Sequence, residues 1–111
     1  MTPVVVRRAD REDYALLPPI EEASDQVFAT FGVHVPAGVS APEDYDDAAI
    51  VLIVGTPPVG FARVDMVDGL PHLEQISVHP HAARRGIGSA LLEAAVTKRI
   101  LVSTTPKRGG P

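Results

Sequence analysis

The sequence predicts a single α+β domain in which helices flank a mixed, mostly antiparallel sheet. Its 111 residues are enough for one domain. Hydrophobic residues make up 45% of the chain, which favours a folded core over a disordered chain. Three strand-like runs follow one another through short connections, and short connections favour antiparallel neighbours. Helix-like segments stand on both sides of these runs, so the expected order of elements is β-α-α-β-β-β-α-β.

The N-terminal part predicts one strand and two helices. Val4–Val6 is β-branched and apolar, as short strands often are. Asp10 is placed to cap a first helix, which Pro18 interrupts because proline lacks an amide donor. Pro19 then suits the first turn of a second helix over residues 19–31, where apolar residues recur at helical spacing.

The middle of the chain predicts a surface loop followed by three strands. Residues 33–47 are rich in Pro, Gly, Ser and Asp, which favours a loop. Ala49–Val54 is continuously apolar and indicates a buried strand, whereas residues 59–67 and 73–78 alternate loosely between apolar and polar. The dipeptide Asp68-Gly69 joins the last two runs and is a strong hairpin signal.

The C-terminal part predicts a helix and a tail. Leu91 and Ala95 form one of two apolar i, i+4 pairs that indicate an amphipathic helix. Residues 100–102 fit either a fifth strand or the frayed end of that helix. Residues 106–111 are expected to be disordered, so the folded domain is expected to cover residues 1–105.

Composition excludes several kinds of function. The absence of cysteine excludes a disulfide scaffold, Cys-ligated zinc and cysteine catalysis. No apolar stretch approaches the ~20 residues of a membrane span, and the N-terminal charges follow the apolar run instead of preceding it as in a signal peptide. No H-x-x-x-H spacing suggests a metal site. We therefore expect a cytoplasmic protein without a metal or a membrane partner.

Charge is divided unevenly along the chain, whose formal net charge is −4. Residues 1–47 carry −7 and residues 48–111 carry +3. The chain as a whole is not expected to bind nucleic acid, because phosphate backbones require a concentrated basic face. The positive half is suited to a small anionic ligand, and the alternative is that the division is only surface composition.

The sequence RRGIGS at residues 84–89 is the most informative segment. It opens a helix, whose first turn has unpaired N–H groups and a partial positive charge. Gly86 and Gly88 let a ligand approach the backbone, and two arginines add positive charge, so the segment suits a phosphate or pyrophosphate. The spacing does not match a P-loop, which needs a lysine, or a dinucleotide fingerprint, which needs a third glycine where Leu91 stands. The alternative is a helix that merely has a glycine-rich entry.

The stretch HLEQISVHPHAARRGIGSALLEAAV resembles the central motif of the GNAT superfamily of acyl-CoA-dependent N-acyltransferases. That motif is a strand, Val-His-Pro, a short loop, Arg/Gln-x-x-Gly-x-Gly/Ala and a helix, and the wider resemblance covers residues 3–97. It departs from the pattern at Ala83, where the family usually has Arg or Gln. The resemblance implies an N-acetyltransferase that moves the acetyl group from acetyl-CoA to a primary amine by direct attack. The alternative is an acyl-CoA-binding or interaction module of the same fold without efficient catalysis.

The resemblance also implies a set of cofactor-binding residues. Backbone N–H groups at the start of the helix would cradle the CoA pyrophosphate, and the preceding strand would pair with the pantetheine arm. The implied residues are Ile76, Ser77, Val78, Arg84, Arg85, Gly86, Ile87, Gly88 and Ser89.

Glu74 is the candidate catalytic residue, because a carboxylate near the thioester can accept the proton that the attacking amine loses. The alternatives for Glu74 are a solvent-facing side chain or an ion pair with Arg63. His34 is the alternative base. His79 is expected to be structural in the His-Pro turn, and His72 and His81 are expected to be exposed.

The acids of the second helix and of residues 43–47 either attract a cationic amine or form a solvated face. The helix acids are Glu21, Glu22 and Asp25.

A complete domain of this family continues with another helix and two strands, so the resemblance implies a C-terminally truncated, GNAT-like domain. The family helix usually supplies a tyrosine as general acid, and neither Tyr14 nor Tyr45 matches that position. The open explanations are a shortened or frameshifted product, a second copy that completes the sheet, or a cofactor site without efficient catalysis. An exposed sheet edge favours self-association, so we expect a homodimer.

Overall fold

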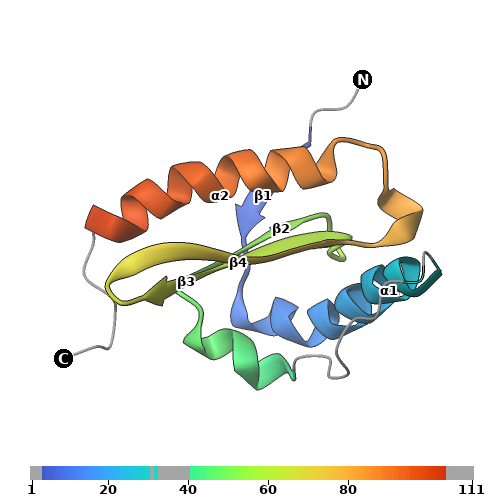
Figure 1. Ribbon diagram of the computed structural model, residues 1–111, viewed down its shortest axis with the longest axis horizontal. Coiled ribbons are helices and arrows are strands. Elements are labelled where there is room, and N and C mark those ends of the chain that lie inside the picture. Colours follow the sequence, from blue (N-terminus) through green and yellow to red (C-terminus); the bar gives the residue numbers. More distant parts are fainter. Residues whose placement is uncertain (1–3, 31, 33–40, 105–111) are drawn as a thin grey trace.

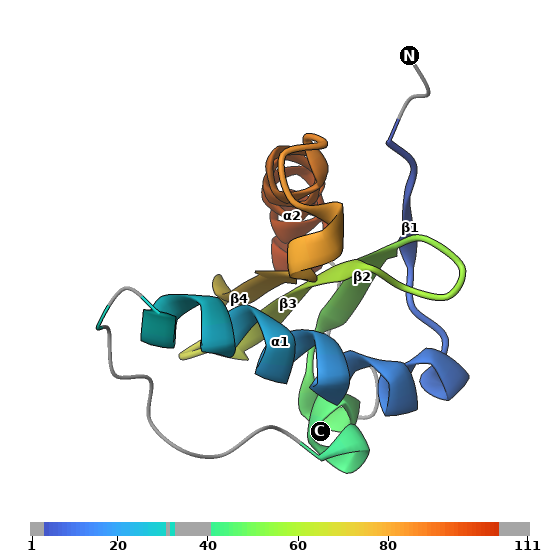
Figure 2. The same cartoon turned by 90° about the vertical axis from the view of Figure 1, so that its right-hand side faces the viewer.

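The computed structural model describes residues 4–30, 32 and 41–104, and only the backbone path for residues 26–30 and 98–104. Four antiparallel strands form one sheet in the order β1-β2-β3-β4. One helix covers each face of this sheet, so the layers are helix, sheet and helix (Figures 1 and 2). The predicted α+β class is confirmed. The strands are β1 (Val6–Arg8), β2 (Ile50–Val54), β3 (Gly60–Val67) and β4 (Leu70–Val78), and the two α-helices are α1 (Leu17–Thr30) and α2 (Ile87–Thr104).

Strand β2 is buried along its whole length because both faces of the sheet are covered. Its alternate side chains feed two separate cores. Leu52 packs with the α2 side, and Val51 and Ile53 pack with the α1 side. Burying one such aliphatic side chain stabilises the fold by about 1.5–3 kcal/mol. The predicted buried strand is therefore confirmed, and it positions both helices.

The first helical segment differs from the prediction in kind and in its cap. Residues Arg11–Leu16 form a 3-10 helix, η1, that leads directly into α1 at Leu17. Asp10 is the N-cap residue, as predicted, but it acts through its backbone: its carbonyl oxygen accepts the Asp13 N–H at 2.9 Å, and its N–H donates to the Asp13 carboxylate at 2.8 Å. Both Pro18 and Pro19 lie in the first turn of α1, where a missing N–H costs no helical bond.

The predicted surface loop is wrong for the part that the structure describes. Residues 33–40 lie outside the described residues, but Pro42–Asp47 is a second 3-10 helix, η2. The carboxylate of Asp44 accepts the Ala41 N–H at 2.8 Å. Tyr45 is completely buried in the core on the α1 side, which is why a segment of loop-like composition is ordered.

The β3–β4 hairpin forms where the sequence predicts it. Asp68 and Gly69 have φ angles of 52° and 79°, as a two-residue hairpin turn with left-handed residues requires. Strand β4 starts at Leu70, three residues earlier than expected. The register is interrupted once: Arg63 faces Gln75 but Val64 faces Leu73, which leaves Glu74 as an extra residue on β4. This irregularity is a β-bulge, and bulges re-aim side chains.

Helix α2 continues through residues 100–102. Of the two alternatives for this segment, the structure has the helix, and the strand at the end of the expected order is not formed there. Residues 106–111 lie outside the described residues. Within the part of the chain that the structure describes, β4 has a strand partner on one edge only.

Candidate functional site

The start of α2 presents free backbone donors. The first bond of the helical ladder runs from the Ala90 N–H to the Gly86 carbonyl oxygen, at 3.0 Å. The N–H groups of Ile87, Gly88 and Ser89 come before that bond, so they have no acceptor within the helix. They also lie at the positive end of the helix dipole, which favours an anion there.

The loop before α2 holds two residues in left-handed backbone conformations. Arg84 has a φ of 64° and Gly86 a φ of 77°. A Cβ at Gly86 would meet no atom within 4 Å, so the backbone conformation, not lack of space, requires glycine there. A left-handed arginine costs about 1–2 kcal/mol, and such strained residues cluster at functional sites.

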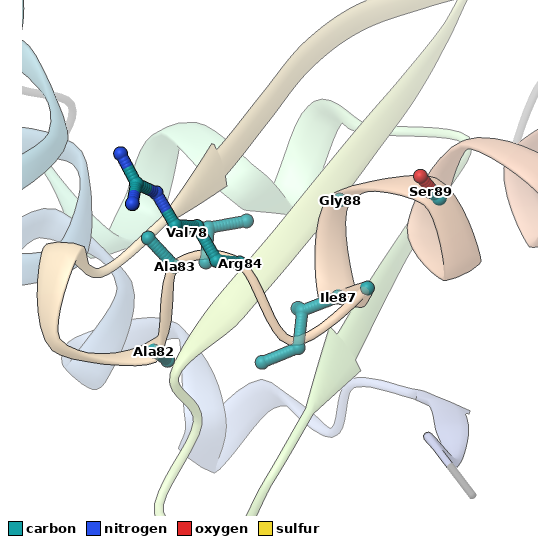
Figure 3. Close-up of a pocket in the computed structure, with 8 residues that line it drawn as sticks. Val78, Ala82, Ala83, Arg84, Ile87, Gly88 and Ser89 are labelled. Carbon is teal, nitrogen blue, oxygen red and sulfur yellow. The ribbon is translucent and has the colours of Figure 1, made fainter.

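A cavity of about 300 Å³ opens beside this loop (Figure 3). A Cβ at Gly88 would lie 3.9 Å from Val78 Cγ2, a side chain of the cavity wall. A larger side chain at position 88 would therefore extend along the wall of the cavity, and glycine keeps the cradle open. The lining residues are Val78, Ala82, Ala83, Arg84, Gly86, Ile87, Gly88 and Ser89.

The last residues of β4, which lead to the cavity, direct some of their backbone N–H and C=O groups to the open edge of the sheet. The His79 N–H donates inward to the Val59 carbonyl oxygen at 2.8 Å. Because N–H and C=O directions alternate along an antiparallel strand, Ser77 also faces inward, whereas Ile76 and Val78 direct their backbone groups to the open edge. Two of the three predicted strand residues thus present backbone groups that pair with no strand in the described part of the chain. The third, Ser77, is buried, and its hydroxyl accepts a hydrogen bond from the Gln75 side chain at 3.1 Å.

Gly60 fixes the position of the first turn of α2, although it is not among the site residues predicted from the sequence. A Cβ at this position would lie 3.0 Å from Ile87 Cγ2 and 3.3 Å from the Ser77 carbonyl oxygen. The helix can therefore approach β3 and β4 closely only because residue 60 is glycine. A signal existed in the sequence, since glycine at the start of a strand-like run often marks a close backbone approach.

Glu74 lies at the bulge and is half exposed. Its carboxylate pairs with His72, with 3.8 Å between Oε2 and Nε2. The alternative of an ion pair with Arg63 is not formed: Arg63 pairs with Asp65 at 2.8 Å and also donates to the Asp44 carbonyl oxygen at 2.8 Å. The Glu74 side chain faces solvent, which was the other alternative for this residue. His72 is exposed as predicted.

The acidic residues of α1 do not form a uniform solvated face. Glu21 is buried, and the Tyr45 hydroxyl donates to its carboxylate at 3.1 Å. Burial raises the pKa of Asp25, and the neighbouring Glu21 raises it further. Glu22 is exposed, as are the four acids of η2. The alternative base His34 lies outside the described residues.

The remaining histidines lie at the end of β4. His81 is exposed, as expected. The His79 ring accepts a hydrogen bond from the His81 N–H at 3.1 Å, which agrees with a structural role.

Neither a metal site nor a membrane-spanning helix is found among the described residues. Among them no group of three or more His, Asp or Glu side chains is arranged to hold a metal ion. None of the helices that the structure describes is both long and apolar enough to cross a bilayer.

The edge of β4 that has no strand partner among the described residues, the left-handed loop and the start of α2 follow one another along the chain. The family model of the acetyltransferase (GNAT) domain matches residues 46–108. This chain belongs to the GNAT acetyltransferase family. The match includes β2, β3, β4 and α2, and of these β4 and α2 contribute residues to the cavity.

Solved structures share the fold of this GNAT chain at low sequence identity. A GNAT family acetyltransferase from Brucella melitensis in complex with acetyl-CoA aligns with a TM-score of 0.69 at 18% identity, over 90% of this chain and 70% of that one. The yncA protein from Salmonella typhimurium with its cofactor acetyl-CoA aligns with a TM-score of 0.69 at 17% identity, over 91% and 65%. No curated protein sequence matches the chain.

The ribosomal-protein-S18-alanine N-acetyltransferase from Escherichia coli aligns with a TM-score of 0.63 at 17% identity. The alignment covers 86% of this GNAT chain but only 59% of the Escherichia coli chain. This chain therefore spans about three fifths of that enzyme.

Proposed function

We propose that this GNAT chain is an N-acetyltransferase that uses acetyl-CoA as its co-substrate. The observation that carries the proposal is the open start of α2, where three backbone N–H groups without helical acceptors border a cavity next to the free edge of β4. A pyrophosphate satisfies such donors and interacts favourably with the helix dipole. The acetyl-CoA found in the Brucella melitensis and Salmonella typhimurium structures is consistent with this ligand.

In the proposed complex the pyrophosphate accepts hydrogen bonds from the backbone of residues 86–89, and the exposed side chains of Arg84 and Arg85 add positive charge. The pantetheine arm runs along β4 and pairs with the outward backbone groups of Ile76 and Val78. Ser77 lies between these two residues, and its own backbone groups point inward toward β3 and not toward the arm. The cradle does not depend on the side chain at Ala83, so this departure from the family pattern leaves the main-chain donors in place.

Glu74 is the proposed general base. It lies four residues before Val78, which is about 13 Å along an extended strand, so an arm bound along β4 brings the thioester toward it. The amine nitrogen attacks the thioester carbonyl carbon, the C–N bond forms and the C–S bond breaks. Glu74 takes the proton that the amine loses, directly or through water, and the thiolate leaves to be protonated.

A second candidate function is a CoA-binding module without turnover. Tyr45 favours it, because this residue is completely buried and its hydroxyl donates to Glu21. It is therefore not placed to protonate a leaving thiolate. The two candidates share the cofactor site and differ only in whether thiol is released.

Calorimetric titration with CoA tests the shared cofactor site. Gly88→Glu places a bulky anion against the cradle, and we expect CoA affinity to fall by about 100-fold or more. Thr97→Glu adds the same charge to an exposed position farther along α2 and is the control, with affinity within about threefold of the parent. Failure of the parent to bind CoA would refute both candidate functions.

Thiol release in the presence of a panel of primary amines separates the two candidates. Glu74→Gln removes the base while conserving shape, so we expect kcat to fall by about 100-fold while the KM for acetyl-CoA changes little. Glu93→Gln, an exposed acid of α2, is the control. Equal turnover in parent and Glu74→Gln would exclude Glu74 as the base, and CoA binding without turnover in the parent would favour the module.

We also propose a homodimer and a cytoplasmic location. The dimer is supported by apolar side chains exposed near the open sheet edge and on α2. Leu70 is 68% exposed, and Leu92 and Val96 are 48% and 46% exposed one helical turn apart. Recovery of the protein with the membrane or secreted fraction of cells would contradict the location.

A further inference from the structure

We propose that His79 is a positioning residue of the cofactor site: its imidazole caps the turn that leads into the loop at 83–86. The inference rests on the proposed acetyl-CoA site. His79 does not line the cavity, so it acts through the loop and does not touch the ligand.

Three polar groups of His79 bond to two segments, the residue before β3 and the turn at residues 80–82. Its N–H donates to the Val59 carbonyl oxygen at 2.8 Å, which fixes it at the end of β4. Its carbonyl oxygen accepts the Ala82 N–H at 2.8 Å, and its Nδ1 accepts the His81 N–H at 3.1 Å. An imidazole nitrogen that accepts a hydrogen bond carries no proton on that atom, so this bond uses Nδ1 as the acceptor.

The turn that follows, the 3-10 helix η3 (Pro80–Ala82), has few other ways to satisfy its donors. Pro80 has no N–H, and the His81 N–H comes too early for a carbonyl partner within the turn. The His79 ring supplies that partner, as an N-cap side chain does. The cap therefore removes an unpaired donor and restricts the backbone directly before the left-handed Arg84.

Packing of Ala82 holds the turn in addition to the cap. The His79 and His81 rings stack with centroids 4.9 Å apart and planes inclined by 16°. Ala82 is 4% exposed and packs in the core on the α2 side. The Ala82 methyl group thus anchors the turn in the core, and the His79 cap holds its first residue. The backbone position at which the 83–86 loop begins is therefore restricted.

The experiment compares three variants in ligand-free and CoA-bound protein. His79→Ala removes the cap, whereas His79→Asn keeps an oxygen that can accept the N–H two residues later, as in an Asx turn. His81→Ala removes the stacked ring but keeps the N–H and is the control. CoA affinity is measured by calorimetry, amide exchange of residue 81 by NMR, and folding by thermal melting.

We expect His79→Ala to bind CoA about fivefold more weakly, since the competent loop becomes less populated, and to exchange the residue-81 amide about fivefold faster. His79→Asn recovers most of both properties, and His81→Ala stays within about twofold of the parent in affinity. A merely structural histidine would not be rescued by asparagine, which is much smaller than imidazole.

Two results would overturn the inference. One is a His79→Ala protein with parental affinity and parental amide exchange. The other is a folded His79→Asn protein as weak as His79→Ala, which would attribute the effect to ring packing. If the parent itself fails to bind CoA, the proposed function fails separately, and amide exchange alone tests the cap. Unchanged exchange in His79→Ala then overturns the capping role. Faster exchange in His79→Ala that His79→Asn restores to the parental rate supports it.

Discussion

Two carboxylates at the start of the chain have pKa values shifted in opposite directions. Burial raises the pKa of Asp13. The hydrogen bond from the Asp10 N–H and the Arg7 guanidinium 3.2 Å away together lower it by more than burial raises it, so the pKa of Asp13 lies below its usual value. Burial raises the pKa of Asp25, and the neighbouring Glu21 carboxylate raises it further. The first carboxylate therefore stabilises the fold when charged, and the second opposes folding when charged.

Asp13→Asn tests the first of these effects. A folded pKa below the unfolded value contributes stability that is present above the unfolded value of about 3.9 and is lost as pH falls through the folded pKa. We expect the variant to lose about 1 kcal/mol at pH 7, the usual size of a lost cap contact. Urea unfolding at pH 7 and at about pH 3 measures this, and a difference that does not shrink in acid would contradict it.

Asp25→Asn is the matched variant of opposite sign. Its folded pKa is raised, so the charged form costs stability above the unfolded pKa, and that cost disappears once both states are protonated in acid. We expect the variant to be more stable than the parent at pH 7 and equal to it at about pH 3. A higher urea midpoint for the parent at pH 7 would contradict the account.

At the scale of elements, Gly60 allows α2 to pack on the sheet. A methyl group there would press on Ile87 and on a backbone carbonyl, which gives way less readily than a side chain. We expect Gly60→Ala to lower the free energy of unfolding by about 1–3 kcal/mol, as overpacking does. The same change in an Ile87→Ala background should cost less, and equal costs in a double-mutant cycle would show that the contact is not the cause.

Elements defined by local chemistry could be predicted from sequence, and elements held by distant partners could not. The Asp68-Gly69 hairpin and the buried β2 depend on turn residues and an apolar run, so local sequence identifies them. The 3-10 helix η2 depends on Tyr45, whose ring meets Phe61 edge to face at 5.6 Å and lies under the Arg63 guanidinium at 5.7 Å. Composition carries no sign of those partners. The sequence signal for η2 was Pro42 followed by two acids, which is typical of a helix start.

The candidate site shows the same contrast. Its cofactor half is almost contiguous, from β4 through the loop to α2, so a motif of 25 residues described it. Its acidic half joins Glu21 to Tyr45, 24 residues apart. The Glu74 bulge likewise arises from the register between two strands and not from the alternation of either strand. Whether Glu74 pairs with Arg63 or faces solvent could be decided only from that register.

At the scale of the whole molecule, the positively charged part of the chain is the part that contains the proposed cofactor site. The C-terminal part, with its +3 charge, contains the cradle, and the N-terminal part, with its −7 charge, contains the acids of α1 and η2. This division suits an anionic co-substrate and a cationic acceptor that bind from different elements.

The proposed homodimer is tested at this scale by light scattering. We expect a mass near twice the 11.7 kDa of the chain at micromolar concentration. Leu92→Lys and Val96→Lys together place charge on the exposed apolar turn of α2 and should shift the mass toward the monomer if that turn lies in the interface. A monomeric parent would contradict the dimer without affecting the cofactor site.

The central claim is that acetyl-CoA binds with its pyrophosphate on the first turn of α2. An NMR titration of the isotopically labelled protein with CoA tests it most directly. The account predicts the largest amide shifts at residues 86–89, with further shifts at Ile76 and Val78, whose backbone groups face the open edge of β4. Saturable binding that leaves residues 86–89 unshifted would contradict the account.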